Sequence, residues 1–384
     1  MANKWLLIAG GLLIFLVLFY LSPLIELGKH LISGPGVVFS FILPDGLKSN
    51  DGRTNVLLLG TGGTGHEGPN LTDSLMVVSV GVKQQDIALV SLPRDIWIDS
   101  LSAKINAAYA FGEEKKAGGG KILARSTIAE VLGIPIHYVL RVDFAGFRQA
   151  IDLLGGIDVL VDRSFEDLRY PTEGKETDSC GYIEEKRIEK TIKESSTSAK
   201  KETIEQEVIY YIDATGSAKR AEDDPYSCRF EKITFSKGLQ HMDGQIALRF
   251  VRSRDGTHGE GSDFARAKRQ QKVLLALKDK VFSVPTFLDP GKLASLIKTF
   301  ANNVDTDIGA DDIGDLVKLS GKIDFAVIKH VVLTDEENGL LFNPPPQDYQ
   351  GAWVLVPKVG NWSEVASYIK RELFSQEKDS PQEE

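Results

Sequence analysis

The most constraining feature of the sequence is an apolar run over residues 5–25 that contains no charged side chain. At a rise of about 1.5 Å per residue, a helix of this length crosses a hydrocarbon core of about 30 Å. Lys4 and the amino terminus precede the run, and positive charge favours the cytoplasmic side of a membrane. The sequence therefore predicts residues 1–4 in the cytoplasm, a transmembrane anchor at 5–25 and an extracytoplasmic remainder. A cleaved signal peptide is the alternative interpretation.

The chain after the apolar run has the pattern of an α/β protein. Residues 26–50 read as a juxtamembrane connector, and from residue 55 short apolar runs alternate with helical patterns. We predict strands at residues 55–60, 73–80, 86–92, 138–142 and 157–161, and helices at 120–132 and 144–154. The second and third strands are joined by only a short connection, which predicts a hairpin. This alternation favours a central mixed β-sheet flanked by helices, which we assign to residues 51–342.

Residues 165–235 depart from this pattern, because they are highly charged and hold few long apolar runs. We interpret them as an insertion on the surface. The two cysteines of the chain, Cys180 and Cys228, both lie in it, 48 positions apart. Outside the cytoplasm such a pair favours a disulfide, and two free thiols are the alternative. After the α/β region come a C-terminal extension at 343–374 and an acidic tail at 375–384, whose composition predicts disorder.

A basic stretch over residues 249–271 is the strongest candidate for a binding site. Glycines at positions 256, 259 and 261 predict a loop with unusual backbone freedom. Arg252 and Arg254 enter this loop, and Ser262 or Asp263 can cap the helix that leaves it. A helix N-terminus surrounded by arginines suits a phosphate or a pyrophosphate.

The helix that follows the loop predicts an inward-facing arginine. Arg266 and Gln270 share a helix face with Leu274 and Leu277. Because an unpaired buried cation is costly, an inward arginine needs an anionic partner. The alternative interpretation is a solvated basic helix start, since the first turns carry several further cations.

The total charge narrows the possible ligands. A net charge of −9 excludes a general affinity for nucleic acid, and the chain has no DNA-reading motif. A chain with only two cysteines also cannot build a cysteine-rich zinc site. A local basic cluster on an acidic chain therefore indicates a defined anionic ligand.

Short motifs follow one another along the chain in a specific order. They are Asn-Val-Leu-Leu-Leu-Gly (55–60), Thr-Asp-Ser (72–74), Ser-Leu-Pro-Arg-Asp (91–95), Lys-Ile-Asn-Ala-Ala-Tyr (104–109), Val-Asp-Phe-Ala-Gly-Phe (142–147), Leu-Leu-Gly-Gly-Ile-Asp-Val (153–159), Ala-Leu-Arg-Phe-Val-Arg-Ser-Arg (247–254) and Asp-Phe-Ala-Arg-Ala-Lys-Arg-Gln-Gln (263–271). This series resembles the LytR-CpsA-Psr family of cell-envelope proteins. The resemblance covers about residues 55–281, apart from the insertion.

The resemblance implies a fold and an activity. Members of the family have a central β-sheet flanked by helices, outside the membrane and behind one N-terminal transmembrane helix. They transfer glycopolymers from a polyprenyl-pyrophosphate carrier to peptidoglycan, with a divalent metal that is usually Mg²⁺. We therefore expect a membrane-anchored phosphotransferase whose partners are the lipid-linked glycan, a peptidoglycan acceptor and the membrane.

The resemblance also assigns roles by position. The residues that would hold the pyrophosphate are Arg94, Arg252, Arg254 and Arg266, with support from Gln270. Asp73 would sit at the metal, and it would act in catalysis together with Arg94 and Arg266. Three further motif positions join the pyrophosphate site, namely Lys104, Asn106 and Arg269.

The sequence departs from the family pattern at two positions. Gly62 stands where the family usually has an aspartate, and Leu71 stands where it usually has an arginine. His66 or Glu67, in the same loop as Gly62, could replace the missing ligand, and ordinary polar loop residues are the alternative interpretation.

Two other functions stay open at this point. One is hydrolysis, in which a polyprenyl-pyrophosphate pyrophosphatase uses water in place of the wall acceptor. The other is non-catalytic binding of the carrier lipid by a regulator of envelope assembly.

Overall fold

The computed structural model describes residues 46–66, 68–175, 177–194, 201–220, 226–281, 304–309, 312, 315–316, 319, 323 and 328–374, and only the backbone of 189–194, 201–207 and 219–220. The predicted anchor at 5–25, most of the connector and the tail at 375–384 lie outside this part of the chain. Within it, no helix is long and apolar enough to cross a bilayer. The described residues form two compact units. Unit 1 comprises those up to Val159, Leu239–Val251 and those from Ala267 onward, and unit 2 comprises Leu160–Gly238 and Arg252–Arg266.

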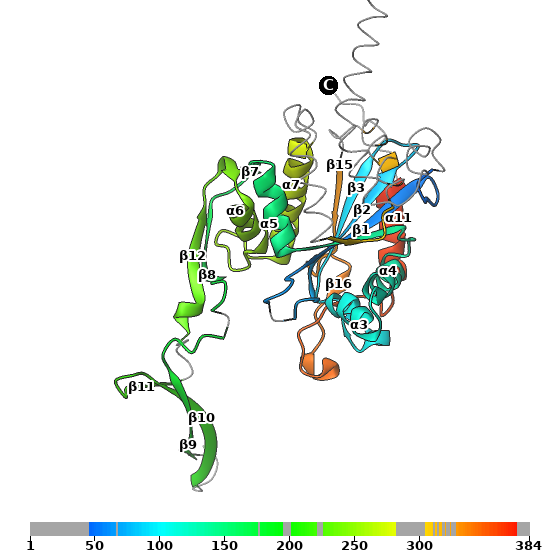
Figure 1. The fold of residues 1–384 in the computed structure, drawn as a ribbon. Coiled ribbons are helices and arrows are strands. Elements are labelled where there is room, and N and C mark those ends of the chain that lie inside the picture. Colours follow the sequence, from blue (N-terminus) through cyan, green and yellow to red (C-terminus); the bar gives the residue numbers. More distant parts are fainter. Residues whose placement is uncertain are drawn as a thin grey trace, which may run out of the picture. The chain divides into compact units, whose positions relative to one another are not determined.

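Unit 1 is built on a six-stranded sheet with the strand order β14-β6-β1-β2-β3-β15 (Figure 1). Its strands are β1 (Arg53–Thr61), β2 (Thr72–Gly81), β3 (Ile87–Leu92), β6 (Tyr138–Asp143), β14 (Val304–Thr306) and β15 (Ile328–Val332). The pairs β1-β6 and β3-β15 are parallel, whereas β1-β2, β2-β3 and β14-β6 are antiparallel. The predicted mixed sheet and the hairpin of its second and third strands are thus confirmed.

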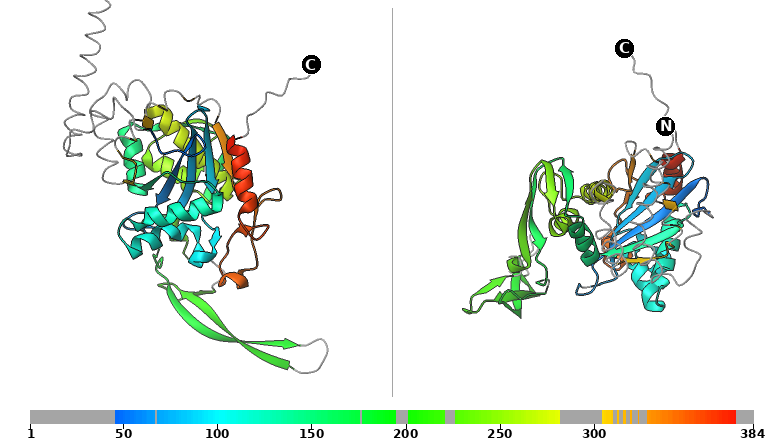
Figure 2. Two further views of the ribbon diagram at one scale, coloured as in Figure 1. Left: turned by 90° about the vertical axis from the view of Figure 1, so that its right-hand side faces the viewer. Right: turned by 45° about the horizontal axis from the view of Figure 1, so that its top comes forward.

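Helices cover both faces of this sheet, because successive residues of a strand point to opposite sides. Leu57 and Leu59 of β1 join one core, and Leu58 packs against a second core on the other face. The helices of the first core are α3 (Ala108–Lys115), α4 (Gly119–Leu132) and α11 (Ser363–Phe374), and α7 (Asp263–Val281) packs on the second. Figure 2 shows α11, in red, beside the sheet.

The C-terminal helix α11 belongs to the core of unit 1. Val365, Ile369 and Leu373 are buried in the same cluster as Leu57 and Leu59. Residues 343–374, which the sequence presents as an extension, therefore complete one face of the sheet. Two short antiparallel strand pairs lie on the same side of the unit. β4 (Trp97–Ile98) pairs with β5 (Ala103–Lys104), and β16 (Leu341–Phe342) pairs with β17 (Val356–Pro357).

The remaining elements follow in chain order. They are α5 (Phe144–Leu153), β7 (Ile157–Val161), β13 (Gly238–Met242) and α6 (Gly244–Arg252), and β7 pairs with β13. The predicted helix at 144–154 and the predicted strand at 157–161 match α5 and β7. Asp143 caps α5, because its Oδ1 accepts a hydrogen bond from the backbone N–H of Gly146 at 2.8 Å.

Unit 2 holds the charged stretch that the sequence predicts as an insertion. β8 (Phe165–Pro171) pairs antiparallel with β12 (Phe230–Phe235), and Phe165 stacks on Phe235. A separate three-stranded sheet contains β9 (Ile183–Glu194), β10 (Lys201–Ile212) and β11 (Ala218–Arg220). A disulfide joins Cys180 to Cys228. Phe165 and Phe235 are buried, so the base of this region is packed, and it is not surface throughout.

Candidate anion-binding site

An ion pair joins the ends of β2 and β3 in unit 1. Leu75 of β2 lies opposite Leu92, the last residue of β3; Asp73 precedes Leu75 by two residues, and Arg94 follows Leu92 by two. The Nη1 of Arg94 donates to Oδ1 of Asp73 at 2.7 Å, and the two side chains are 26% and 38% exposed. The antiparallel register therefore brings the predicted metal ligand into contact with the predicted phosphate-binding arginine.

Two more predicted residues gather around this pair. Lys104 at the end of β5 donates from Nζ to Oδ1 of Asp95 at 2.6 Å, and Nε of Arg94 lies 3.5 Å from Oδ2 of the same carboxylate. The backbone N–H of Asn106 donates to the carbonyl of Arg94 at 3.3 Å. Asp95 thus connects two cations.

Asn106 contacts its neighbours through its backbone. Its carbonyl accepts a hydrogen bond from Oγ1 of Thr72 at 3.1 Å. Asn106 therefore acts through its backbone to join the segment after β3 to the start of β2. The described contacts place two cations and two carboxylates at one end of the sheet, where the interior strands β2 and β3 begin and end.

A third cation at the same end of the sheet was not predicted. Arg141, in β6, donates from Nε to Oγ1 of Thr61 at 2.9 Å, and its Nη1 lies 3.9 Å from Oδ2 of Asp143. Its guanidinium also lies 5.8 Å from the centre of the Tyr109 ring. Thr61 ends β1 and pairs with Thr72 of β2, so Arg141 lies on the other side of β1 from Asp73.

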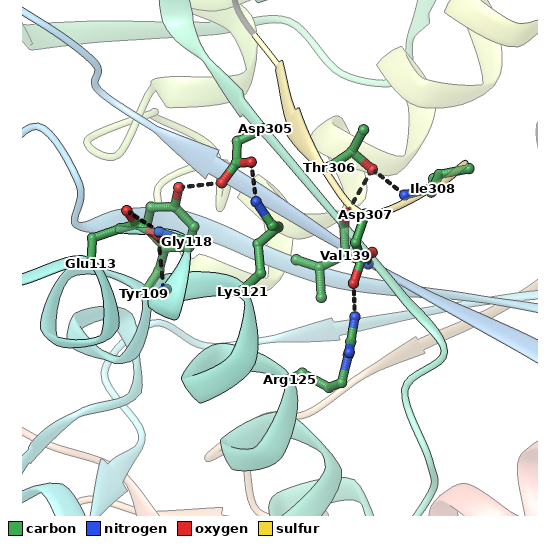
Figure 3. Close-up of polar contacts among 11 residues, drawn as sticks. Tyr109, Glu113, Gly118, Lys121, Arg125, Val139, Asp305, Thr306, Asp307 and Ile308 are labelled. Carbon is green, nitrogen blue, oxygen red and sulfur yellow. Dashed lines mark hydrogen bonds and ion pairs between the residues drawn. The ribbon is translucent and has the colours of Figure 1, made fainter. Parts of the chain in front are cut away.

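Tyr109 connects this end of the sheet to a charged network on β14 (Figure 3). Its hydroxyl donates to Oδ2 of Asp305 at 2.8 Å, and Lys121 of α4 pairs with the same carboxylate. Burial and the Asp305 hydrogen bond raise the pKa of Tyr109. Burial also raises the pKa of Asp305, but hydrogen bonds from Lys121 and Tyr109 outweigh it, so this pKa lies below its ordinary value. Together with the Arg125–Asp307 pair, these contacts attach β14 to α3 and α4.

The loop after β1 explains why position 62 is a glycine. A Cβ added to Gly62 would lie 2.9 Å from Cβ of His66, so the His66 side chain covers this position. The His66 ring contacts Phe144 edge-on, with 5.3 Å between the ring centres. Leu71 is exposed, and Glu67 lies outside the described residues. An aspartate at position 62 would therefore displace His66.

The described residues contain no preformed cluster of metal ligands at this end of the sheet. In the described part of the chain, one group of three ligand side chains comes together, at Asp178, Cys180 and Cys228. The disulfide between these cysteines leaves no thiolate for a metal. At this end of the sheet, Asp73 offers one partly exposed carboxylate. A single carboxylate fits Mg²⁺, because this ion takes few protein ligands and fills its other positions with phosphate oxygens and water.

Unit 2 carries the arginine loop, residues 252–258, which follows α6. Nη1 of Arg252 donates to the hydroxyl of Tyr170 at 3.5 Å, and its guanidinium lies 5.8 Å from that ring. Backbone N–H groups of Arg254 and Asp255 donate to Oδ2 of Asp167, at 3.1 and 3.3 Å. Sequence reasoning missed Asp167, because nothing in the local pattern links it to a loop more than 80 positions away.

The helix α7 begins in unit 2 with Arg266. Ser262 caps it, because its Oγ accepts from the backbone N–H of Ala265 at 3.1 Å. The buried Arg266 pairs through Nη2 with Oδ1 of Asp263 at 2.7 Å. Arg266 therefore has the anionic partner that an inward-facing arginine needs.

In unit 1, α7 continues with residues whose roles differ from the prediction. Arg269 is buried and donates from Nε to the carbonyl of Phe250 at 2.8 Å, so it caps the end of α6. Gln270 is half-buried. The buried amide is that of Gln271. Its Nε2 donates to Oγ of Ser91 at 3.0 Å, and its Oε1 lies 2.6 Å from Nδ1 of His330.

The predicted site residues therefore fall into two sets that the structure describes separately. The set in unit 1 comprises Asp73, Arg94, Lys104, Asn106, Arg269 and Gln270, and the set in unit 2 comprises Arg252, Arg254 and Arg266. In unit 1, four of the six lie together, namely the Asp73–Arg94 pair with Lys104 and Asn106. In unit 2, the loop and the helix start present three arginines along a short length of chain.

The fold is an α/β sheet with helices, and arginine, lysine and aspartate side chains gather where the central strands β2 and β3 end. Residues 42–354 match the LytR_cpsA_psr family, and the chain belongs to this family. It is 25% identical to the polyisoprenyl-teichoic acid–peptidoglycan teichoic acid transferase TagU of Bacillus cereus over 268 residues, which is 69% of this chain and 63% of TagU. The TagV transferase of Bacillus subtilis is 27% identical over 243 residues, 62% of this chain and 45% of TagV. The chain thus spans under two thirds of these relatives.

Solved structures show the same fold. The crystal structure of B. subtilis TagV superposes with a TM-score of 0.51 at 23% identity, covering 85% of this chain and 100% of that one. The protein gbs0355 from Streptococcus agalactiae gives a TM-score of 0.52 at 19% identity, covering 85% and 90%. The fold of the family, a central mixed sheet with helices, is therefore the fold of this chain.

Proposed function

We propose that this protein is a phosphotransferase that moves a glycopolymer from a polyprenyl-pyrophosphate carrier to peptidoglycan or another envelope acceptor. The observation that carries the proposal is the cluster of Arg94, Lys104 and Asp73 at one end of the sheet. Arg94 contacts Asp73, and both Arg94 and Lys104 contact Asp95. Membership of the family and the similarity to the teichoic acid transferase TagU support it.

The chemistry requires groups that hold negative charge in place. The acceptor hydroxyl attacks the phosphorus that carries the glycan, and the bond from this phosphorus to the bridging oxygen breaks. Polyprenyl phosphate leaves with the bond electrons, and the hydroxyl proton must go to a base. Guanidinium and ammonium groups stabilise the charge that develops on the leaving oxygen, and they do so mainly by electrostatics and positioning.

Asp73 and Arg94 are placed to work as a coupled pair. In the structure Arg94 is engaged by Asp73, and an arriving pyrophosphate competes for the same guanidinium. When Arg94 turns to the phosphate, the Asp73 carboxylate can take a cation or accept the hydroxyl proton. Lys104 would add a second positive charge. Arg252, Arg254 and Arg266 of unit 2 are further residues that the family resemblance assigns to pyrophosphate binding.

Mg²⁺ is the proposed cofactor. When bound, it would neutralise phosphate charge, and Asp73 would supply its protein ligand. Gly62 and Leu71 leave this chain with fewer charged side chains than the family pattern, so we expect phosphate and water to supply a larger share of the metal ligands. The transmembrane anchor at residues 5–25, with the two units outside the cytoplasm, completes the proposal.

The test uses the full-length chain in detergent, a polyprenyl-pyrophosphate-linked oligosaccharide, Mg²⁺ and peptidoglycan fragments. We expect glycan linked to the acceptor, lost with EDTA and reduced about a hundredfold in Arg94→Ala. Arg187→Ala is the matched control, because Arg187 forms an exposed ion pair with Glu185 in unit 2. Arg187→Ala should transfer like the wild type.

The same assay separates the two competing functions. Cleavage of the carrier without linkage to the acceptor would favour a pyrophosphatase. Binding of the carrier lipid without any turnover would favour a non-catalytic regulator. Either result would remove the transferase proposal.

A further inference from the structure

A buried carboxylate underlies the arginine loop of unit 2. Asp167, in β8, is 1% exposed, and among the described residues its hydrogen-bond partners are one hydroxyl and three backbone N–H groups. Its Oδ2 accepts from Oγ of Ser253 at 2.7 Å, and from the backbone N–H groups of Arg254 at 3.1 Å and Asp255 at 3.3 Å. Its Oδ1 accepts from the backbone N–H of Arg169 at 2.9 Å. Four donors therefore satisfy one buried carboxylate.

Three of these donors come from consecutive residues of the loop. Ser253, Arg254 and Asp255 converge on a single oxygen atom, so the carboxylate sets the path of the backbone between them. A backbone bridge between Asp167 and Gly256 follows directly. The next residue, Thr257, donates its backbone N–H to the carbonyl of Glu166 at 2.9 Å. The loop is thereby attached to β8 along its whole first half.

The same strand also holds the arginine that precedes the loop. Tyr170 lies three residues after Asp167 in β8, and its hydroxyl and ring contact the guanidinium of Arg252. β8 thus fixes the backbone at Arg254 through Asp167 and the side chain of Arg252 through Tyr170. Both arginines occupy positions that the family resemblance assigns to the pyrophosphate.

We propose that Asp167 is a positioning residue for pyrophosphate binding, and that it acts by holding the backbone of Arg254 in place beside Arg252, which Tyr170 of the same strand contacts, before the ligand arrives. The inference rests on the proposed function of these two arginines. Phosphate recognition by arginine depends on the direction of the guanidinium, so an ordered backbone beneath it lowers the cost of binding. It also gives the charged insertion a role, because β8 belongs to that region.

The test combines hydrogen exchange with ligand binding, on the full-length chain in detergent. The variant is Asp167→Asn, which removes the charge and replaces one of the two acceptor oxygens by an N–H₂ group that faces a donor in either orientation of the amide. We expect the amide protons of Arg254 and Asp255 to exchange at least about tenfold faster. Glu166→Gln is the matched control, because the neighbouring Glu166 side chain pairs with Lys232 on the exposed side.

Binding is measured with farnesyl pyrophosphate, and with inorganic pyrophosphate to separate the headgroup from the lipid. We expect the dissociation constant to rise about tenfold in Asp167→Asn. In an Arg254→Ala background the same change should cost less than about twofold, because the residue it positions is already absent. A residue that only supports folding would give the same loss in both backgrounds.

Ser253→Ala is a second variant that removes one donor and keeps the carboxylate, so it tests the proposal if Asp167→Asn folds poorly. It should give the same two effects at smaller size. Wild-type binding in Asp167→Asn beside lost binding in Arg254→Ala would overturn the positioning role and leave the proposed function intact. Wild-type binding in Arg254→Ala would overturn the phosphate contact of Arg254 and with it the positioning role, whereas the proposed function is tested separately by transfer in Arg94→Ala. Unchanged exchange at Arg254 and Asp255 would overturn the positioning role by itself.

Discussion

Arg94 and Asp73 lie opposite each other at the ends of two antiparallel strands, with 2.7 Å between Nη1 and Oδ1. The pair predicts that position 94 needs a guanidinium and not merely a positive charge. In Arg94→Lys the ammonium can still reach Asp73, but it cannot form two parallel hydrogen bonds to a phosphate. We expect kcat/KM for glycan transfer to fall about tenfold, against about a hundredfold for Arg94→Ala. Equal activity of Arg94→Lys and the wild type would contradict the proposed contact.

A second prediction concerns the buried Arg53. It is 1% exposed, donates to Asp86 at 2.8 Å and to Oγ of Ser79 at 2.8 Å, and also donates to the carbonyl of Leu373 at the end of α11. Arg53→Met should lower the free energy of unfolding by about 3–5 kcal/mol, because it leaves buried acceptors unpaired. Urea denaturation measures this change.

Arg371→Ala is the control for that experiment, since Arg371 is an exposed arginine on α11 itself. We expect it to leave the denaturation midpoint near the wild-type value. If Arg53→Met were as stable as Arg371→Ala, the buried contacts of Arg53 would not stabilise the fold.

A third prediction concerns the disulfide. Cys180 and Cys228 are 48 positions apart, and closing a loop of this length stabilises a fold by about 3–4 kcal/mol in the chain-entropy model. The double variant Cys180→Ser, Cys228→Ser should therefore unfold at lower denaturant in unit 2, as followed by hydrogen exchange in β8 and β12. Reductant should have the same effect on the wild type and no effect on the variant. A wild-type transition that is insensitive to reductant would refute this.

A fourth prediction concerns pH. The Nδ1 of His137 accepts a hydrogen bond from the backbone N–H of Asn55 at 2.9 Å, so the folded protein holds this ring neutral. Burial, with the charges of Arg125 and Lys48, lowers the pKa of His137. The folded pKa thus lies below the unfolded value of about 6.5. The unfolded chain then binds more protons, so the stability is complete above about pH 6.5 and falls as the pH drops toward the folded pKa.

His137→Asn tests that sign, because asparagine offers an acceptor oxygen near the position of Nδ1 and does not titrate. The urea midpoint of the variant should vary less between about pH 7 and pH 5 than that of the wild type. Burial and the charge of Lys268 also lower the pKa of His330, so some pH dependence of the same sign should persist. Parallel curves for the two proteins would show that His137 carries none of it.

Much of unit 1 could be predicted because its strands are continuous apolar runs. The predicted strands at 55–60, 73–80 and 86–92 match β1, β2 and β3 to within two residues. The strands of unit 2 could not be found in this way. In β9, and in the first half of β10, charged residues outnumber the apolar ones and show no strand-like alternation with them, and such a pattern resembles that of a solvated surface segment.

The residue types of the site could be predicted from the sequence, but their contacts could not. The motifs identified Arg94, Asp73 and Lys104, and the structure brings them to one end of the sheet. The helical pattern selected Gln270, whereas the buried amide is Gln271, which contacts Ser91 of β3 and lies beside His330 of β15. The buried face of α7 is set by the strands beneath it, and two adjacent glutamines give the local pattern no means to choose between them.

The sequence by itself determined the alternation of strands and helices, the mixed sheet, the family and the residue types of an anion-binding site. These follow from local periodicity and from short motifs, which are properties of neighbouring residues. Only the tertiary structure decided the partners of the charged groups: Asp73 for Arg94, Phe250 for Arg269, and Asp167 for the loop at Ser253. Asp167 and Ser253 are 86 positions apart, and a contact over that distance exists only after strands and loops have packed and excluded water from the carboxylate.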